Sequence, residues 1–96
     1  MDIKQLNNDE IKVQMLKALA DETRLQIVRM LRDVEGELNC GEIGERIHIS
    51  KSTAAYHFKT LREAGLTSTR KDSRCKYVRL RTDTFREYLP GFLDSL

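Results

Sequence analysis

Apolar residues recur at helical spacing through most of this 96-residue chain. A first helix is expected after a cap at Asn8 or Asp9, and a second after a cap at Asp21. Their apolar positions are Ile11, Met15, Leu16, Leu19, Leu25, Ile27, Val28, Leu31 and Val34. Gly36 is expected to end the second helix, because glycine readily adopts the left-handed conformation found there. Residues 1–7 are mostly polar and are expected to be flexible.

Two short helices joined by a tight turn are predicted over residues 40–64. Asn39 caps the first and Ser50 caps the second, 51–64, since both side chains can accept hydrogen bonds from free backbone amides. The second helix has Ala54, Phe58 and Leu61 at i, i+4 and i+7, and these side chains must pack inward. Gly65 ends this helix. The pattern is that of a helix-turn-helix.

A hairpin and an interrupted helix complete the chain. Residues 67–81 contain two strand-like runs rich in Thr, Tyr and Val around a turn at 72–74, and a very short strand is expected at 37–38. Residues 82–96 carry an apolar stripe at helical spacing. Pro90 interrupts this stripe, because proline lacks an amide donor, and a short helix, a kink and another short turn are expected.

The length allows one domain, 1–96, which is mainly α with a small β-hairpin. With 40% hydrophobic and 33% charged residues, the chain reads as soluble and globular. No apolar run approaches the roughly 18 residues that a membrane span needs. The N-terminus lacks the basic and then apolar layout of a signal peptide, so a cytoplasmic protein is expected.

Charge is distributed unevenly along the chain. Residues 1–47 hold 7 Lys/Arg and 10 Asp/Glu, a net −3. Residues 48–81 hold 9 Lys/Arg and 2 Asp/Glu, a net +7. Residues 82–96 hold 1 Lys/Arg and 3 Asp/Glu, a net −2. A basic middle between acidic flanks indicates one positive surface that faces a polyanion, with a solvated basic face as the alternative.

Polar side chains open the expected helix 51–64. A recognition helix places its first turns against base edges in the major groove, where short hydrogen-bonding side chains such as Ser52 and Thr53 are needed. The longer candidates on this helix are Lys51 and Lys59 for the flanking phosphates, and Tyr56 and His57 for bases or backbone. In the hairpin, the candidates for DNA contacts are Arg70, Lys71, Arg74 and Lys76. A structural role for His57 and half-buried packing of Tyr56 are the alternatives.

Three stretches carry a more specific pattern. They are LKALADETRLQIVRML (16–31), GELNCGEIGERIHISKSTAAYHFKTLREAGL (36–66) and RKDSRCKYVRL (70–80). Together they resemble the ArsR-type winged helix-turn-helix repressors of bacteria. The resemblance spans roughly residues 10–81. It implies a winged helix-turn-helix with its wing at 67–81 and a dimerisation segment at 82–96.

The resemblance further implies a homodimer that represses transcription from an inverted-repeat operator until an inducer, here unknown, releases it. In this family the positions matching Lys51, Ser52, Ala55, Tyr56 and His57 face DNA. Ala55 stands where serine is common, and Tyr56 where arginine or glutamine is common. The dimer interface is expected to comprise Ile11, Met15, Phe85, Tyr88, Leu89 and Phe92. Packing of the last segment within one subunit is the alternative.

Both common metal sites of the family lack their ligands in this sequence. At the first site the chain reads Glu37-Leu38-Asn39-Cys40-Gly41, with Asn39 and Gly41 in place of cysteines. Residues 82–96 contain no histidine for the second site. A single thiolate does not satisfy a soft metal, and the remaining carboxylates suit only a weakly held hard ion. No metal and no other cofactor is therefore expected.

Cys40 and Cys75 leave a thiol switch open. They lie 35 residues apart and match no zinc spacing, so two reduced thiols are the simplest interpretation. Cys75 lies between Arg74 and Lys76, and cationic surroundings make a thiol more reactive. A redox-responsive repressor that uses Cys75 or Cys40 is therefore one alternative.

Two further function classes can be compared with the sequence. A winged helix can serve as a protein-interaction module, but such a module needs an exposed apolar or acid-binding patch. Steep salt dependence of DNA binding would separate a DNA-binding protein from that module. An enzyme is not expected, because the sequence has no glycine-rich phosphate loop and no paired acid/base cluster.

Overall fold

The computed structural model describes residues 3–96, and their side chains from Asn8 onward. The elements in chain order are α1 (Ile3–Leu19), α2 (Glu22–Val34), β1 (Glu37–Asn39), α3 (Cys40–Arg46), α4 (Lys51–Glu63), β2 (Thr67–Asp72), β3 (Cys75–Leu80), α5 (Thr82–Tyr88) and a short 3-10 helix, η1 (Leu93–Ser95). The predicted set of helices with a small hairpin is confirmed. No described helix is long and apolar enough to cross a membrane.

Side chains cap three helices at the predicted positions. The Arg24 amide donates to Asp21 Oδ1 at 3.0 Å at the start of α2. The Thr53 amide donates to Ser50 Oγ at 3.2 Å at the start of α4. Asn39 Oδ1 accepts two amide hydrogen bonds at the start of α3. Each cap satisfies amides that have no partner inside the helix.

Two predicted helix ends were wrong. Helix α1 begins at Ile3 and not after a cap at Asn8 or Asp9, because neither glycine nor proline interrupts the preceding residues. The predicted flexibility of residues 1–7 stays a prediction, since Met1 and Asp2 lie outside the described residues. Helix α2 ends at Val34, and its C-cap residue Glu35 takes the left-handed conformation (φ 52°) that was predicted for Gly36.

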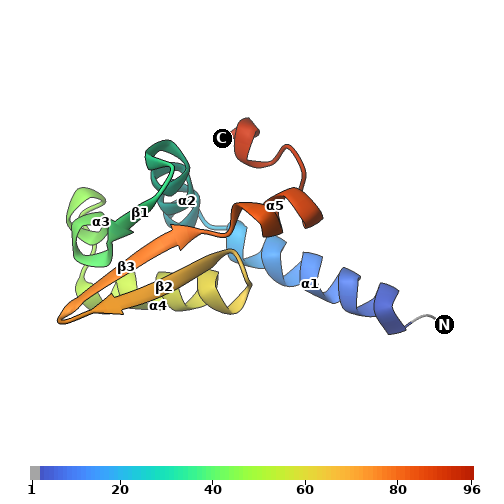
Figure 1. Ribbon diagram of the computed structural model, residues 1–96, viewed down its shortest axis with the longest axis horizontal. Helices are drawn as coiled ribbons and strands as arrows, with labels where there is room; N and C mark the ends of the chain where they lie inside the picture. The colour runs from blue at the N-terminus through green and yellow to red at the C-terminus, as the bar shows by residue number, and fades with distance from the viewer. Residues whose placement is uncertain (1–2) are drawn as a thin grey trace.

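The three strands form an antiparallel sheet in the order β1-β3-β2. The pairing of Glu37 with Arg79 and of Thr67 with Leu80 sets its register. Strands β2 and β3 meet at a two-residue turn in which Ser73 has φ 58°. The hairpin of β2, β3 and this turn, residues 67–80, is called the wing below. It projects from the body of the domain (Figure 1).

One core joins the helices to the wing. Its fully buried members come from α1, α2, α3, α4, β3, α5 and the loop between α4 and β2. They include Met15, Ile27, Val28, Leu31, Ile43, Leu61, Leu66, Val78 and Phe85. Met15 and Phe85 were predicted to lie in a dimer interface. They are 0% and 1% exposed in a single chain, because the faces of α1 and α5 that carry them already pack inward. Their assignment to a partner-facing surface was therefore wrong.

The C-terminal segment is interrupted at Pro90, as predicted, and it then turns back over α2. Helix α5 ends at Tyr88, Pro90 follows, and η1 forms after Gly91, which has φ 82°. Arg32 Nη1 of α2 donates to the carbonyl oxygen of Leu93 at 2.8 Å and also to that of Leu96. These bonds hold the segment above α2, on the far side of the domain from α4 (Figure 1).

Candidate nucleic-acid interface

Helix α4 presents a polar first turn on a rigid support. Ala54, Phe58 and Leu61 are buried on its inner face. At its other end, the Gly65 amide donates to Arg62 O at 2.9 Å, and the next amide donates to Leu61 O at 3.0 Å. This pair of bonds satisfies the last carbonyls of the helix. The outer face of α4 therefore stands in a fixed orientation.

Six of the predicted DNA-facing side chains of α4 are exposed: Lys51, Ser52, Thr53, Ala55, Tyr56 and Lys59. The hydroxyls of the first turn form a cluster with the cap, since Ser50 Oγ lies 2.9 Å from Thr53 Oγ1 and 3.2 Å from Ser52 Oγ. Tyr56 is 62% exposed, which excludes the alternative of half-buried packing in the single chain. Short polar groups thus surround the amino end of the helix, as major-groove reading requires.

His57 does not lie on this open face, and its predicted exposure was wrong. It is 8% exposed, and its Nδ1 atom lies 3.0 Å from Arg24 Nη1 of α2. Arg24 is itself buried, and its Nε donates to the carbonyl oxygen of Ala18. A buried arginine on α2 thus draws the imidazole inward, where unpaired polar groups would be costly. The sequence showed no sign of this contact, because 33 residues separate the two side chains.

The predicted cations of the wing fall into two groups. Lys71, Arg74 and Lys76 are exposed and form no ion pair with any described residue. Arg70 instead pairs with Glu37 of β1, and more loosely with Asp72, at 3.7 Å. Its hydrogen bond holds the pKa of the Glu37 carboxyl below its usual value. Three of the four predicted cations of the wing are therefore uncommitted, and Arg70 is already engaged.

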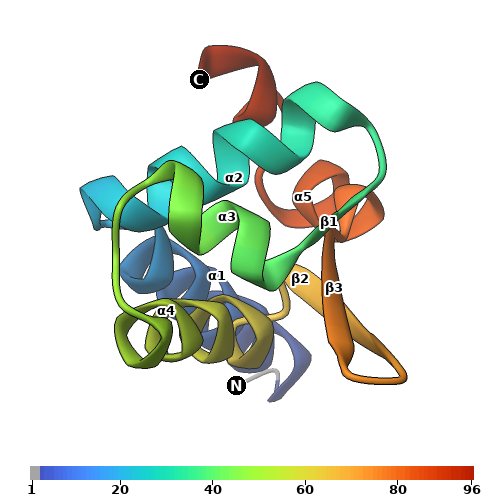
Figure 2. The same ribbon diagram turned by 90° about the vertical axis from the view of Figure 1, so that its left-hand side faces the viewer.

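On α4, Lys59 lies 3.8 Å from Glu63, and both side chains are exposed. Such exposed pairs are weak, so Lys59 can leave Glu63 for a phosphate at little cost. Helix α4 and the tip of the wing lie along the same lower side of the domain in two perpendicular views (Figures 1 and 2). The two cationic elements therefore share one side of the molecule.

The part of the chain that the structure describes contains no assembled metal site. Within residues 8–96, no group of three His, Cys, Asp or Glu side chains is placed to hold an ion. Asn39, at a family ligand position, uses its side chain to cap α3. Cys40 is half-buried, and burial raises the pKa of its thiol, which disfavours the reactive thiolate. Cys75 is exposed at the start of β3.

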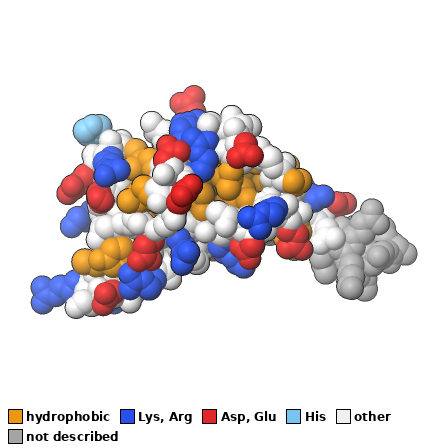
Figure 3. All heavy atoms as spheres, turned by 45° about the horizontal axis from the view of Figure 1, so that its top comes forward, with side chains coloured by type: hydrophobic (Ala, Val, Ile, Leu, Met, Phe, Trp, Pro, Cys, Tyr) orange, Lys and Arg blue, Asp and Glu red, His pale blue; other side chains and the backbone are white. Residues whose placement is uncertain are grey.

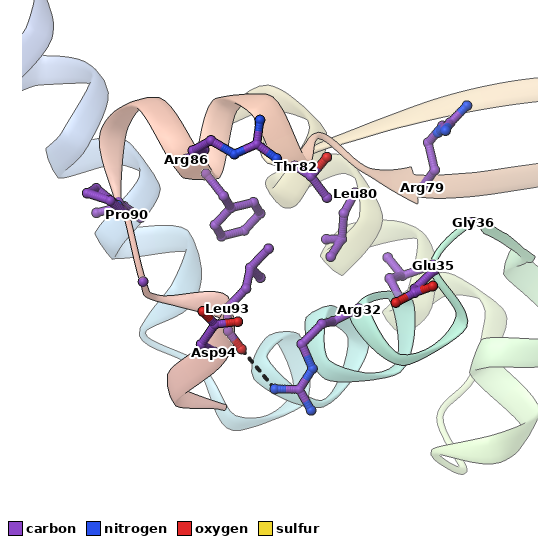
Figure 4. A pocket seen from close by; sticks show the side chains of 14 residues that line it. Arg32, Glu35, Gly36, Arg79, Leu80, Thr82, Arg86, Pro90, Leu93 and Asp94 are labelled. Atoms are coloured by element: carbon purple, nitrogen blue, oxygen red, sulfur yellow. Dashed lines mark hydrogen bonds between the residues drawn. The ribbon is translucent and has the colours of Figure 1, made fainter.

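An open cleft of about 620 Å³ lies on the opposite side of the domain from α4, between α2, the end of β3, α5 and the C-terminal segment. Its floor is apolar and includes Leu31, Leu80, Phe85 and Leu93. Arg79 and Arg86 lie along the edge formed by β3 and α5, and Glu35 and Asp94 lie along the opposite edge (Figure 4). Apolar side chains form a band framed by charged ones on this face of the molecule (Figure 3).

A family model described as "Bacterial regulatory protein, arsR family" matches residues 21–69, which contain α2, the helix-turn-helix and the start of the wing. The chain belongs to the ArsR family of bacterial regulatory proteins. The predicted family is thereby confirmed, and with it the prediction of a DNA-binding transcriptional regulator.

Relatives of this ArsR-family chain are regulators by name. The HTH-type transcriptional regulator YceK of Bacillus subtilis is 62% identical over 96 residues, which are 100% of this chain and 95% of that protein. The transcriptional activator HlyU of Vibrio cholerae is 38% identical over 81 residues, 83% of this chain and 73% of HlyU. The transcriptional repressor SdpR of Bacillus subtilis is 28% identical over 82 residues, 85% of this chain and 89% of SdpR.

Solved structures confirm the predicted winged helix-turn-helix fold. HlyU from Vibrio cholerae aligns with a TM-score of 0.75 at 35% identity, over 92% of this chain and 89% of that one. A Mycobacterium bovis domain described as a homodimeric winged helix-turn-helix DNA-binding domain aligns with a TM-score of 0.82, over 99% of this chain and 87% of that one. At 23% identity, that second likeness shows the fold alone.

Proposed function

We propose that this ArsR-family regulator is a homodimeric repressor that binds an inverted-repeat operator through α4 and the wing. The exposed polar first turn of α4, on the same side as the free cations of the wing, is the observation that carries the proposal. In the proposed complex with the operator, the residues that face bases are Ser52, Thr53, Ala55 and Tyr56. The phosphate contacts come from Lys51, Lys59, Lys71, Arg74 and Lys76. Repression needs only occupancy of a promoter, and SdpR is a named repressor among the relatives.

In the proposed dimer, the second subunit packs against the outer faces of α1 and α5. Val13 and Leu16 are 47% and 50% exposed on α1, although both are large and apolar. Tyr88, Leu89 and Phe92 are half-buried at the end of α5, and Ile11 is half-buried on α1. Val13 and Leu16 lie three residues apart on α1, and exposed apolar residues at this helical spacing favour a protein interface. The Mycobacterium bovis domain of the same fold is described as homodimeric, which supports a dimer without locating its interface.

Selection of binding sites from a random duplex pool tests the proposal. We expect enrichment of an inverted repeat with half-sites about one helical turn apart. Affinity for that repeat should fall steeply with salt, because several phosphates are neutralised. Absence of any enriched sequence, with only weak binding, would instead favour the protein-interaction module. The proposal gives the chain no catalytic role and places it in the cytoplasm.

The inducer is assigned to the cleft between α2 and α5. Its volume lies within the roughly 300–1,000 Å³ typical of small-molecule sites. Arg79 and Arg86 at its edge form no ion pair with the described residues, whereas Arg32 is already engaged by Asp33 and the C-terminal carbonyls. An apolar floor with two free arginines suits a small molecule with an apolar body and one anionic group. Because the cleft joins the wing strand β3 to α5, such a ligand would contact both the DNA-binding and the dimerising parts.

Decanoate and decanol form a matched pair of probes for the cleft, since they differ in the anionic group. Decanoate should raise the melting temperature in a saturable manner and weaken operator binding, and decanol should do neither. Combined Arg79→Gln and Arg86→Gln substitutions should remove the response to decanoate, while Arg29→Gln on the exposed face of α2 should keep it. An unchanged response in the double variant would refute this assignment.

Oxidation of a thiol is the alternative to a small-molecule inducer as the signal that this repressor senses. Cys75 is the better candidate, since it is exposed and lies in the wing, whereas burial makes Cys40 less reactive. Treatment with peroxide should then weaken operator binding by the wild type and by Cys40→Ser, but not by Cys75→Ser. Equal sensitivity of all three proteins would exclude a switch at either thiol.

A further inference from the structure

We infer that Arg24 fixes the neutral imidazole of His57 with its proton on Nε2, and that this N–H donates to a phosphate of the operator. The inference rests on the proposed docking of α4 in DNA. It makes Arg24 a positioning residue for DNA binding, although Arg24 itself is buried at the junction of α1 and α2.

Three contacts hold the Arg24 guanidinium in one place. Its Nε donates to Ala18 O at the end of α1, and its Nη1 lies 3.0 Å from His57 Nδ1. Its Nη2 lies 3.9 Å from Asp21 Oδ2, in the residue that caps α2. Since the Arg24 amide also donates to Asp21, the backbone and the side chain of Arg24 are anchored together. The guanidinium is therefore a fixed point against which the imidazole is set.

The chemistry of arginine determines which nitrogen of His57 carries the proton. Guanidinium nitrogens only donate hydrogen bonds, so Nδ1 of His57 must offer its lone pair to Arg24. In a neutral imidazole the proton then resides on Nε2. Arg24 thus selects one tautomer of His57.

The Nε2–H group is left without a partner inside the protein. None of the described residues accepts a hydrogen bond from it, although the ring is only 8% exposed. The ring lies edge-on to Tyr56, with centroids 5.5 Å apart, next to the exposed outer face of α4. A ring this deeply set cannot extend to the floor of the major groove. The acceptor that fits is a phosphate oxygen at the rim of the groove, close to the helix.

Two substitutions of His57 separate its two nitrogens. Asparagine places an amide oxygen near the position of Nδ1, so His57→Asn keeps an acceptor for Arg24 and loses the outer donor. Glutamine places an amide N–H near the position of Nε2, so His57→Gln keeps the outer donor. We expect His57→Asn to remain folded and to lose operator affinity by about tenfold per half-site, equivalent to roughly 1.4 kcal/mol. His57→Gln should bind more tightly than His57→Asn.

Wild-type binding to the selected operator is measured alongside, which separates this inference from the proposed function. If the wild type binds no duplex, the proposed function fails. If the wild type binds and His57→Asn binds equally well, His57 is only structural and the inference alone fails. A lower affinity for His57→Gln than for His57→Asn would also overturn it.

The tautomer itself can be read by NMR, with long-range proton–nitrogen correlation in the free protein. We expect His57 to show a protonated Nε2 and an unprotonated Nδ1, and operator binding should shift the Nε2 resonance most. In Arg24→Met the preference for this tautomer should weaken, a change that loss of packing alone would not cause. If that variant does not fold, the wild-type spectrum still shows which nitrogen of His57 is protonated. A protonated Nδ1 in that spectrum would refute the inference.

Discussion

Arg70 of β2 reaches across the middle strand of the sheet to Glu37 of β1. Its Nη2 donates to Glu37 Oε1, and its Nε donates to Glu37 Oε2 at 3.3 Å. On the way its guanidinium lies over the ring of Tyr77, 4.6 Å from the ring centroid. The ion pair ties the outer strand of the wing to the strand that precedes the helix-turn-helix. In the proposed complex, a DNA phosphate would therefore compete with Glu37 for this cation.

Glu37→Gln should release Arg70 for phosphate binding. We expect tighter binding to any duplex, and a steeper salt dependence by about one unit of slope per subunit, because each added phosphate contact contributes roughly 0.9. Fluorescence anisotropy at several salt concentrations measures both quantities. Glu45→Gln, which removes an exposed carboxylate of α3 that forms no ion pair with the described residues, controls for the change in net charge. Equal slopes for the two variants would contradict the competition.

Asp21 stabilises α2 in a pH-dependent manner. Hydrogen bonding to the Arg24 amide lowers the pKa of this carboxyl below its ordinary value of 3.8. A lowered native pKa means that the stabilisation is present above the unfolded value and is lost as pH falls through the native value. Asp21→Ala should therefore cost about 1 kcal/mol at neutral pH and less below about pH 4. Asp21→Asn, which keeps a neutral cap, should cost less at neutral pH in the same urea titrations.

The stop of α4 depends on a residue that tolerates positive φ. Gly65 has φ 80° and no atom within 4 Å of an added Cβ, so Gly65→Ala introduces backbone strain and no clash. We expect a loss of about 1 kcal/mol in the free energy of unfolding. Gly36→Ala is the matched control, because Gly36 lacks positive φ and its Cβ would lie 3.8 Å from Val34 O, an ordinary contact. A comparable loss in the control would contradict this explanation.

Tyr56 and Arg74 should affect DNA binding in different ways. Tyr56→Ala should weaken and relax operator choice, at a cost on the order of 1–3 kcal/mol if the ring contacts a base. Arg74→Ala should weaken binding to all sequences alike and make the salt slope shallower. Site selection and salt titration with each variant distinguish the two effects. Arg29→Ala on α2 should change neither. An unchanged binding motif for Tyr56→Ala would show that the ring contacts no base.

Local rules in the sequence located most boundaries of the fold. Asp21, Asn39 and Ser50 cap helices because a short side-chain oxygen meets amides within the next few residues. Gly65 and Pro90 end helices through their own backbone chemistry. Such effects depend on sequence neighbours and are therefore visible without a structure. The polar first turn of α4 followed from the same reasoning.

Partners distant in the sequence could not be predicted in this way. The Arg24–His57 and Arg70–Glu37 contacts each join residues 33 apart, and both change the role of a predicted DNA-binding side chain. Periodicity also identified the apolar side of α1 without showing which apolar residues lie at its centre. Met15 is fully buried while its neighbour Leu16 is half exposed, a difference set by where α2 and α4 pack.

The exposure of Leu16 on α1 allows a direct test of the proposed dimer interface. Leu16→Glu places a charge on the exposed apolar surface assigned to the partner, so the folded chain should become monomeric in sedimentation experiments. Operator affinity should fall on the order of 100-fold or more, because the two half-sites are no longer bound by one linked pair. Val34→Glu, at a position that is 42% exposed on α2, should stay dimeric and bind normally. A folded Leu16→Glu protein with the mass of a dimer would place the subunit interface elsewhere.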